Sequence, residues 1–151
     1  MISGARRYAG FLRGVHEVAG DAARVERACG TYTFDAGRIA AEAFVARGND
    51  RPTAIFATSD ELLIGLYEVL IASGLSVPRD VSIVGFDDVG PLHLFAPAVT
   101  AVRQPVRELG KRALELLLDH KPEEDGTLPQ EELLPVTLIE RDSVAPPIRS
   151  A

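Results

Sequence analysis

The sequence is poor in cysteine and contains no long apolar run. Cys29 is the one cysteine in 151 residues, which excludes an internal disulfide and a cysteine-based metal site. No stretch of about 18 apolar residues occurs, so no segment is predicted to span a membrane. The opening residues MISGARRYAGF lack the apolar core and small-residue cleavage site of a secretory signal peptide. These absences predict a cytoplasmic protein.

Basic residues are too scattered to form a phosphate-binding surface. The formal net charge is -6, and Arg6, Arg7 and Arg13 are the one local concentration of positive charge. Binding to nucleic acid requires clustered lysine and arginine, and no helix-turn-helix, zinc finger or aromatic RNA-binding strand can be read in the sequence. We therefore predict that this chain does not bind DNA or RNA by itself.

Catalytic patterns are missing as well. The sequence has no Ser-His-Asp order, nucleophile elbow, phosphate-cradling glycine loop or metal-spaced histidine set. Three histidines, at positions 16, 93 and 120, lie in unrelated contexts and give little support to acid–base chemistry. We therefore predict that the protein is not an enzyme and that it has no catalytic residue, no metal ligand and no cofactor.

The sequence does contain short apolar segments that alternate with amphipathic ones. This alternation is typical of βα units, so the predicted fold is α/β with a mostly parallel sheet. Asp35 and Thr58 are predicted helix caps, and Gly74 is predicted to end a helix. The predicted helices are 5–19, 35–46, 60–73 and the segment from Pro105, and the predicted strands are 1–3, 24–31, 53–57, 81–86, 99–102 and 132–140.

Two of these strands, TAIFA (53–57) and VSIVGF (81–86), are apolar throughout. Continuous apolar character indicates burial on both faces, which is typical of interior strands of a parallel sheet. We therefore predict that both strands lie at the centre of the sheet.

Polar residues directly follow three successive strands. They are Thr58-Ser59-Asp60, Asp87-Asp88 and Arg103-Gln104. Open α/β sheets bind ligands at the carboxyl ends of their strands, and hydroxyl, carboxylate and amide groups suit a polar small molecule in a cleft. The alternative for each residue alone is a helix cap or a turn, and Asp60 in particular is predicted to be a cap.

Two helices carry more apolar surface than one sheet face can cover. The helix 60–73 has two apolar stripes, which indicates either a second subunit or a neighbouring helix of the same domain. The helix from Pro105 has a wide apolar face, which predicts a homo-oligomer, most simply a dimer, or a helix that folds back on its own sheet. That face consists of Val106, Leu109, Ala113, Leu114, Leu117 and Leu118.

The order and spacing of the segments resemble the LacI/GalR family of bacterial transcription regulators. The matching text is RYAGF, Tyr32 five residues before Gly37, the long run from Arg51 to Asp88, TAVRQP, ELGKRALELLL and LLPVTLIERDSVAP. The resemblance covers nearly the whole chain and implies a periplasmic-binding-protein-like (type I) fold of two α/β subdomains, with a small-molecule effector between them. It also implies a homodimer and DNA binding through an N-terminal helix-turn-helix headpiece.

The resemblance also implies a set of effector-binding residues. By position, Arg7 matches an arginine that contacts effector, and Tyr32 matches an aromatic residue that packs on the ligand. The remaining matches are polar positions at strand ends and in the crossover between subdomains, namely Ser59, Asp87 and Gln104. These groups suit a sugar or nucleoside-like molecule, because a carboxylate and a guanidinium can grip hydroxyls while an aromatic ring covers an apolar face.

Alternatives stay open for two residues of this set and for the neighbouring Asp88. Arg7 could pair with a structural acid, Tyr32 could belong to the core, and Asp88, next to Asp87, could serve as a turn or cap residue.

The sequence departs from the family pattern in extent. The headpiece and most of the N-terminal subdomain have no counterpart, and the chain opens at the strand that normally begins the second subdomain. The predicted divisions are a C-terminal effector-binding subdomain (1–103), a crossover helix and segment that normally belong to the N-terminal subdomain (104–134), and a return strand and tail (135–151).

The predicted function is the effector-binding and dimerisation domain of a LacI-type regulator, with no membrane partner. A solute-binding protein of a sugar transport system is the alternative, because it shares the fold.

Overall fold

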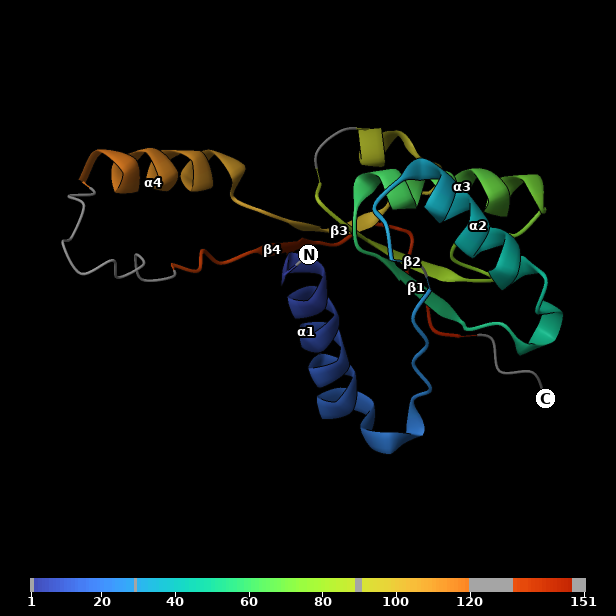
Figure 1. Cartoon of the computed structure of the whole chain (residues 1–151). Helices are drawn as coiled ribbons and strands as arrows, with labels where there is room; N and C mark the ends of the chain where they lie inside the picture. Colours follow the sequence, from blue (N-terminus) through green and yellow to red (C-terminus); the bar gives the residue numbers. More distant parts are fainter. Residues whose placement is uncertain (1, 29, 89–90, 120–131, 148–151) are drawn as a thin grey trace.

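The computed structural model describes residues 2–28, 30–88, 91–119 and 132–147 (Figure 1). The α-helices are α1 (Ile2–Ala19), α2 (Phe34–Val45), α3 (Asp60–Ala72) and α4 (Val106–Asp119). The strands are β1 (Ala54–Ala57), β2 (Ser82–Phe86), β3 (Thr100–Arg103) and β4 (Thr137–Ile139). Within the described residues, three short 3-10 helices lie at Gly20–Ala22, Gly48–Asp50 and Pro91–Leu94. The predicted alternation of helices and strands is confirmed.

The four strands found in the described part of the chain form one sheet in the order β1-β2-β3-β4. β1 pairs with β2 and β2 with β3 in parallel, whereas β4 is antiparallel to β3. The predicted α/β class with a mostly parallel sheet is therefore confirmed, and VSIVGF is an interior strand as predicted.

The prediction that TAIFA lies at the centre of the sheet is wrong, because β1 is an edge strand. Residues 24–28 and 30–31, predicted to form a strand, join no ladder, and Ile2 begins α1 instead of ending a first strand. Both segments have a strand-like composition. A strand forms only where a partner backbone lies within hydrogen-bonding distance, and composition does not show whether such a partner exists.

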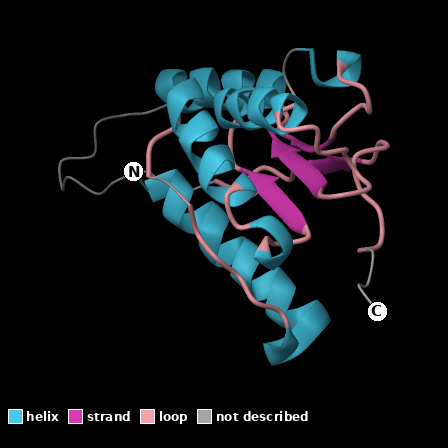
Figure 2. Cartoon of the chain, turned by 90° about the vertical axis from the view of Figure 1, so that its right-hand side faces the viewer, coloured by secondary structure: helices cyan, strands magenta, loops and turns pink. Residues whose placement is uncertain are grey.

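The sheet has helices on both faces (Figures 1 and 2). The main core lies under α2 and α3, where Leu63, Leu70 and Ile83 are fully buried. On the opposite face α1 is held through aromatic contacts: the Phe11 and Phe56 rings stack with their centroids 5.4 Å apart, and Phe56 meets Phe86 edge-on at 6.4 Å. The α1 face is therefore much less densely covered than the α2–α3 face.

Helices α2 and α3 approach each other at two glycines. A Cβ atom on Gly37 would lie 2.3 Å from the Leu62 carbonyl oxygen, and one on Gly65 would lie 2.1 Å from that of Phe34. Only a residue without a side chain allows two backbones to come this close. The α2–α3 pair is thus fixed by glycine at both contact points.

The helix caps differ from the predicted residues by one or two positions. Thr33 caps α2 and Ser59 caps α3, each through a side-chain oxygen that accepts a backbone N–H. Both have extended backbones, as an N-cap requires, whereas Asp35 already lies in the first turn of α2. Asp35 and Thr58 are therefore not the caps. Gly74 follows α3 with φ +72°, as predicted.

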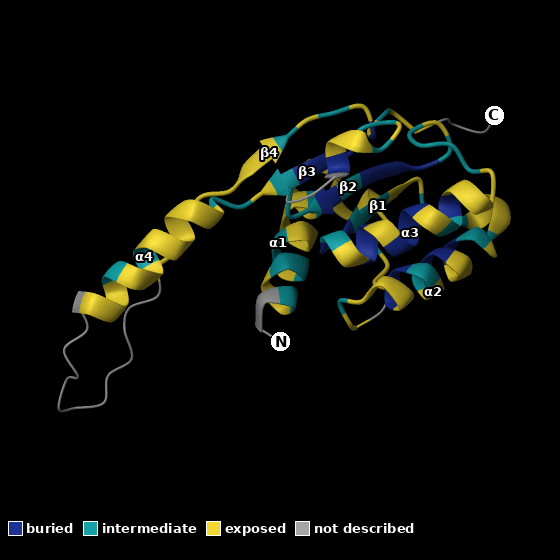
Figure 3. Ribbon diagram, turned by 90° about the horizontal axis from the view of Figure 1, so that it is seen from above, coloured by how far each residue is buried: buried dark blue, intermediate teal, exposed yellow. Residues whose placement is uncertain are grey.

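Helix α4 extends away from the sheet (Figure 1), and most of its surface is exposed (Figure 3). Leu117 and Leu118 are 76% and 77% exposed, and Leu114 is 57% exposed. The expectation that this helix could fold back on its own sheet is wrong for the single chain, so its apolar face has no cover from the described residues.

The segment after β4 is bound into the sheet. Ser143 is fully buried, its hydroxyl donates to the Ile83 carbonyl (2.6 Å), and it accepts the Thr100 N–H (2.8 Å). The Ile83 N–H in turn donates to the Ser143 carbonyl (2.9 Å). Residues far apart in the sequence therefore complete the hydrogen bonding of β2 and β3. Among the described residues, no helix is long and apolar enough to cross a membrane.

Candidate functional site

The strand ends that were predicted to carry polar groups lie at one edge of the sheet. β1, β2 and β3 are neighbours and run parallel, so their carboxyl ends point the same way. Thr58 follows β1, Asp87 follows β2 and Gln104 follows β3. The fold thus brings these three positions to the place where open α/β sheets bind ligands.

Asp87 and Gln104 are in direct contact. The Asp87 backbone has φ 72°, in the left-handed region, and its N–H donates to the Val102 carbonyl at 3.0 Å. Its carboxylate accepts a hydrogen bond from the Gln104 side-chain amide, and both residues are half-buried. A left-handed backbone is unusual for a residue other than glycine, although aspartate tolerates it better than most. One carboxylate therefore links β2 to the crossover that leads into α4.

Arg7 reaches the same edge from α1. Its guanidinium donates to the Thr58 carbonyl at 2.7 Å and lies 3.9 Å from the centroid of the Phe86 ring. The contact with Phe86 places the positive charge beside the residue that precedes Asp87. Arg7 thus contacts a backbone carbonyl and an aromatic ring, and part of the residue is still accessible.

Ser59 and Asp60 mark the start of α3. Ser59 is 8% exposed, and its hydroxyl oxygen accepts the Leu62 N–H at 3.3 Å as the helix cap. Asp60, predicted to be the cap, instead accepts the N–H of the adjacent Glu61 at 2.9 Å. The structure therefore gives Ser59 a structural role at the sheet edge, as the cap of α3.

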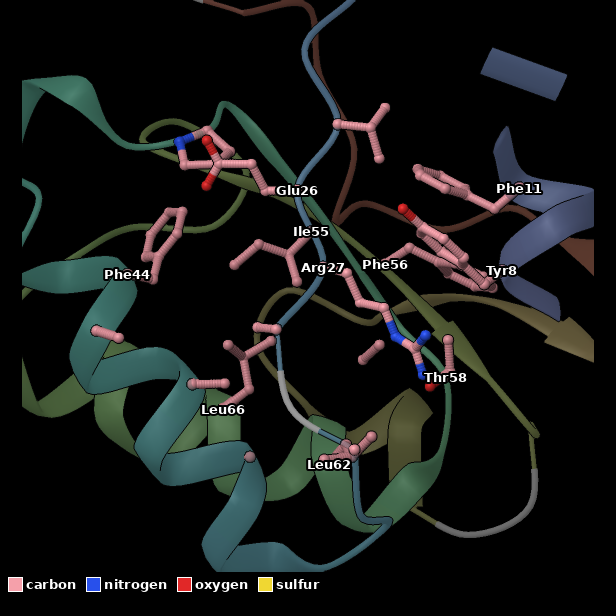
Figure 4. Close-up of a pocket in the computed structure, with 18 of the residues that line it drawn as sticks. Tyr8, Phe11, Glu26, Arg27, Phe44, Ile55, Phe56, Thr58, Leu62 and Leu66 are labelled. Atoms are coloured by element: carbon pink, nitrogen blue, oxygen red, sulfur yellow. The ribbon is translucent and has the colours of Figure 1, made fainter. Parts of the chain in front are cut away.

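Tyr32 lies against the first turns of α1. A Cβ atom on Gly4 would be only 2.4 Å from the Tyr32 hydroxyl, so this hydroxyl touches the helix one turn before Arg7. Tyr32 lines a pocket of about 470 Å³ that also contains Tyr8, Phe11 and Phe44 (Figure 4). Of the five predicted site residues, Asp87 and Gln104 are joined, Arg7 and Ser59 lie at the same sheet edge, and Tyr32 belongs to this pocket.

Sequence reasoning missed an ion-pair cluster beside the predicted site. Only 4% of the Asp88 side chain is exposed. Its carboxylate accepts two hydrogen bonds from Arg141, both at 2.9 Å, and two from Arg103, at 3.0 Å from Nε and 2.5 Å from Nη2. The guanidinium groups of Arg141 and then Arg103 hold the pKa of Asp88 below its usual range. Asp88 is thus not a turn residue. Its carboxylate connects the end of β2 to Arg103 at the end of β3 and to Arg141 just after β4.

No sequence signal could have identified this cluster, because Arg141 lies 53 residues beyond Asp88.

Within the described ranges, no group of three or more histidine, cysteine, aspartate or glutamate side chains is placed to hold a metal ion.

Comparison with known proteins gives consistent matches. Residues 3–144 match the model of the periplasmic binding protein-like domain. The HTH-type transcriptional repressor PurR of Erwinia tasmaniensis is 40% identical over 147 residues, which cover 95% of this chain and 41% of the repressor. The chain therefore spans less than half the length of this curated relative.

Solved structures agree with the sequence match. The Lac repressor bound to ONPG superposes with a TM-score of 0.79 at 25% identity, over 95% of this chain and 42% of that chain. A LacI family transcriptional regulator from Enterococcus faecium with bound ribose gives a TM-score of 0.73 at 30% identity, over 93% of this chain and 51% of that chain. The chain belongs to the family of periplasmic binding protein-like domains, in the form found in LacI/GalR-type transcription regulators.

Proposed function

We propose that this chain forms part of the effector-binding and dimerisation domain of a LacI-type transcription regulator. The observation that carries the proposal is the Asp87–Gln104 pair at the carboxyl ends of parallel strands, with Arg7 beside it. A carboxylate accepts hydrogen bonds from vicinal hydroxyls, and an amide can donate and accept. The effector is therefore a small hydroxyl-bearing molecule such as a sugar or a nucleoside.

The wider assignment follows from the relatives. The curated match is named a transcriptional repressor, and one matching regulator was solved with ribose. DNA contact belongs to a headpiece outside this chain, and the regulator works as a cytoplasmic homodimer. A solute-binding protein shares the fold, but the names of the relatives favour the regulator.

Calorimetry on the intact regulator that contains this segment tests the proposal. Ribose, galactose, adenosine and guanosine serve as probes, and at least one should bind with a dissociation constant below about 100 μM, or about −5.5 kcal/mol. The 151-residue chain alone should bind the same probe no tighter than about millimolar, because a two-lobed cleft needs contacts from both lobes. Equal affinity of the short chain would contradict the two-lobed site, and binding of none of the probes would count against the effector class.

A further inference from the structure

Two neighbouring pairs of side chains join the end of β2 to the chain that leaves β3. The Gln104 side-chain amide donates to the Asp87 carboxylate, and the Arg103 guanidinium donates to the Asp88 carboxylate at 3.0 Å from Nε and 2.5 Å from Nη2. A third link lies one residue earlier, where the Asp87 N–H donates to the Val102 carbonyl at 3.0 Å. The two chain segments are therefore joined at three successive positions.

Asp88 does not depend on Arg103 for a positive partner. Arg141 donates to both oxygens of the Asp88 carboxylate at 2.9 Å, and this bidentate ion pair is of the strong, charge-assisted kind. The Arg103 side chain is 53% exposed, and ion pairs formed by exposed side chains contribute little to stability. The contact of Arg103 with Asp88 therefore matters more for the position of the chain than for the stability of the fold.

Gln104 lies where the chain leaves the sheet. β3 ends at Arg103, whose ladder partner in β4 is Thr137, and α4 begins at Val106 and extends away from the sheet (Figure 1). The Val106 N–H donates to the Gln104 carbonyl at 2.9 Å, so the backbone of Gln104 moves with the start of α4. The Arg103–Asp88 ion pair fixes the residue directly before Gln104 to the end of β2.

We propose that Arg103 is a positioning residue for effector binding. Its ion pair with Asp88 holds the Gln104 side chain against Asp87, and this donor–acceptor pair is therefore in place before a hydroxyl-bearing effector arrives. A glutamine side chain that rotates freely would have to be ordered during binding, and this entropic cost lowers the affinity. The inference rests on the proposed function as far as the effector is concerned, whereas the arrangement of Gln104 can be tested without a ligand.

The ligand-free test is hydrogen exchange of the Gln104 side-chain amide, followed by NMR in the 151-residue chain. Arg103→Met removes the guanidinium but keeps an unbranched apolar side chain, and it should speed this exchange about tenfold, because the hydrogen bond to Asp87 opens more often. Arg103→Lys keeps the positive charge and should restore most of the protection. Arg79→Met is the matched control, because Arg79 is also an exposed arginine that pairs with an aspartate, Asp80, away from this site.

The second test compares affinity with stability in the intact regulator. Calorimetry uses ribose, galactose, adenosine and guanosine as probes, and Arg103→Met should bind whichever probe the wild type binds about fivefold more weakly. The midpoint of urea unfolding should stay close to that of the wild type, because Arg141 still pairs with Asp88. Gly65→Ala is the opposite control: it disturbs the α2–α3 contact, so it should lower the midpoint and leave the affinity unchanged.

Each outcome decides the role of Arg103. The proposal is overturned if Arg103→Met leaves the exchange of the Gln104 amide unchanged, if Arg79→Met speeds it equally, or if Gly65→Ala weakens probe binding as much as Arg103→Met does. If the wild-type regulator binds none of the four probes, the proposed effector class fails, and the exchange of the Gln104 amide still decides whether Arg103 holds this side chain in place.

Discussion

Asp87 and Asp88 are neighbours in the sequence, yet their carboxylates have different surroundings. Asp87 is half-buried and bonded to one neutral amide, that of Gln104. Asp88 is almost fully buried between two guanidinium groups. A carboxylate that is hydrogen-bonded only to a neutral amide can exchange this partner for a ligand hydroxyl. A carboxylate that forms ion pairs with two arginines instead serves to stabilise the fold. The two residues should therefore respond differently to the same substitution.

Asp87→Asn should weaken effector binding in the intact regulator by at least tenfold, or about 1.4 kcal/mol. Asparagine tolerates the left-handed backbone at φ 72°, so the change removes the charge without forcing the chain to move. Calorimetry measures the affinity, and Asp60→Asn is the control because that carboxylate is bonded to its own helix start. Unchanged affinity in Asp87→Asn would remove this residue from the site.

Asp88→Asn should lower the free energy of unfolding by about 2 kcal/mol, the scale of hydrogen bonds to charged groups. Urea unfolding at pH 7 measures the loss, and Asp142→Asn is the matched control because Asp142 is exposed. A loss of the same size in both variants would contradict a specific role for Asp88.

The difference in the free energy of unfolding between wild type and Asp88→Asn should also depend on pH. Because the pKa of Asp88 is lowered in the folded state, its contribution is fully present above the unfolded pKa of about 3.9 and is lost as the pH falls through the folded value. The difference in stability between wild type and Asp88→Asn should therefore be constant from pH 7 to about 5 and shrink below about 4. A difference that persists unchanged down to pH 2 would mean that the ion pairs do not carry it.

At the scale of elements, the contact between α2 and α3 depends on the absence of side chains at Gly37 and Gly65. Gly65→Ala should lower the free energy of unfolding by about 2 kcal/mol, as expected when a tightly packed contact is forced apart. Gly14→Ala in α1 is the control, because a Cβ there meets nothing within 4 Å and alanine favours the helix. Thermal and urea unfolding of the two variants should therefore shift in opposite directions, and a similar shift in both would refute the close-contact explanation.

The sequence predicted where helices and strands lie along the chain better than it predicted which of them are neighbours in space. The 3.6-residue and strand-like patterns located α2, α3, β2 and β3 to within a few residues, since these patterns record which side chains face a core. The sheet position of β1 was not predictable, because the same apolar run serves an edge that is covered by helices on both faces. The site shows the same division: Asp87 and Gln104 follow their strands and could be predicted, whereas the Asp88–Arg141 pair depends on the path of a distant segment.

At the scale of the whole molecule, the exposed apolar face of α4 is the surface that most needs to be covered by a partner. Its exposed leucines would each gain on the order of 1.5 to 3 kcal/mol from burial. A surface of this kind seldom stays open on a soluble monomer, so the chain should self-associate at micromolar concentration, most simply as a twofold dimer. Sedimentation equilibrium measures the mass, and a single species near the chain mass of 16.2 kDa would contradict the prediction.

Substitutions on α4 identify the surface responsible. Leu117→Gln should shift the equilibrium toward monomer at least tenfold, because this side chain is 76% exposed in the single chain and would lie in the contact. Arg107→Gln, also exposed on α4, is the control and should leave the mass unchanged. Association that survives Leu117→Gln intact would move the contact elsewhere, for example to the exposed apolar residues Ile39 and Ile71.

The buried position of Ser143 sets a condition on when the protein can fold as it is synthesised. Ser143 is added 60 residues after Ile83 and 43 residues after Thr100, yet it completes hydrogen bonds with both. A ribosome delivers residues in order, so β2 and β3 emerge with main-chain groups that have no final partner until translation has passed Ser143. The α2–α3 pair can form early, but a nascent chain that stops before this serine carries an unfinished sheet for chaperones to shield or proteases to cut.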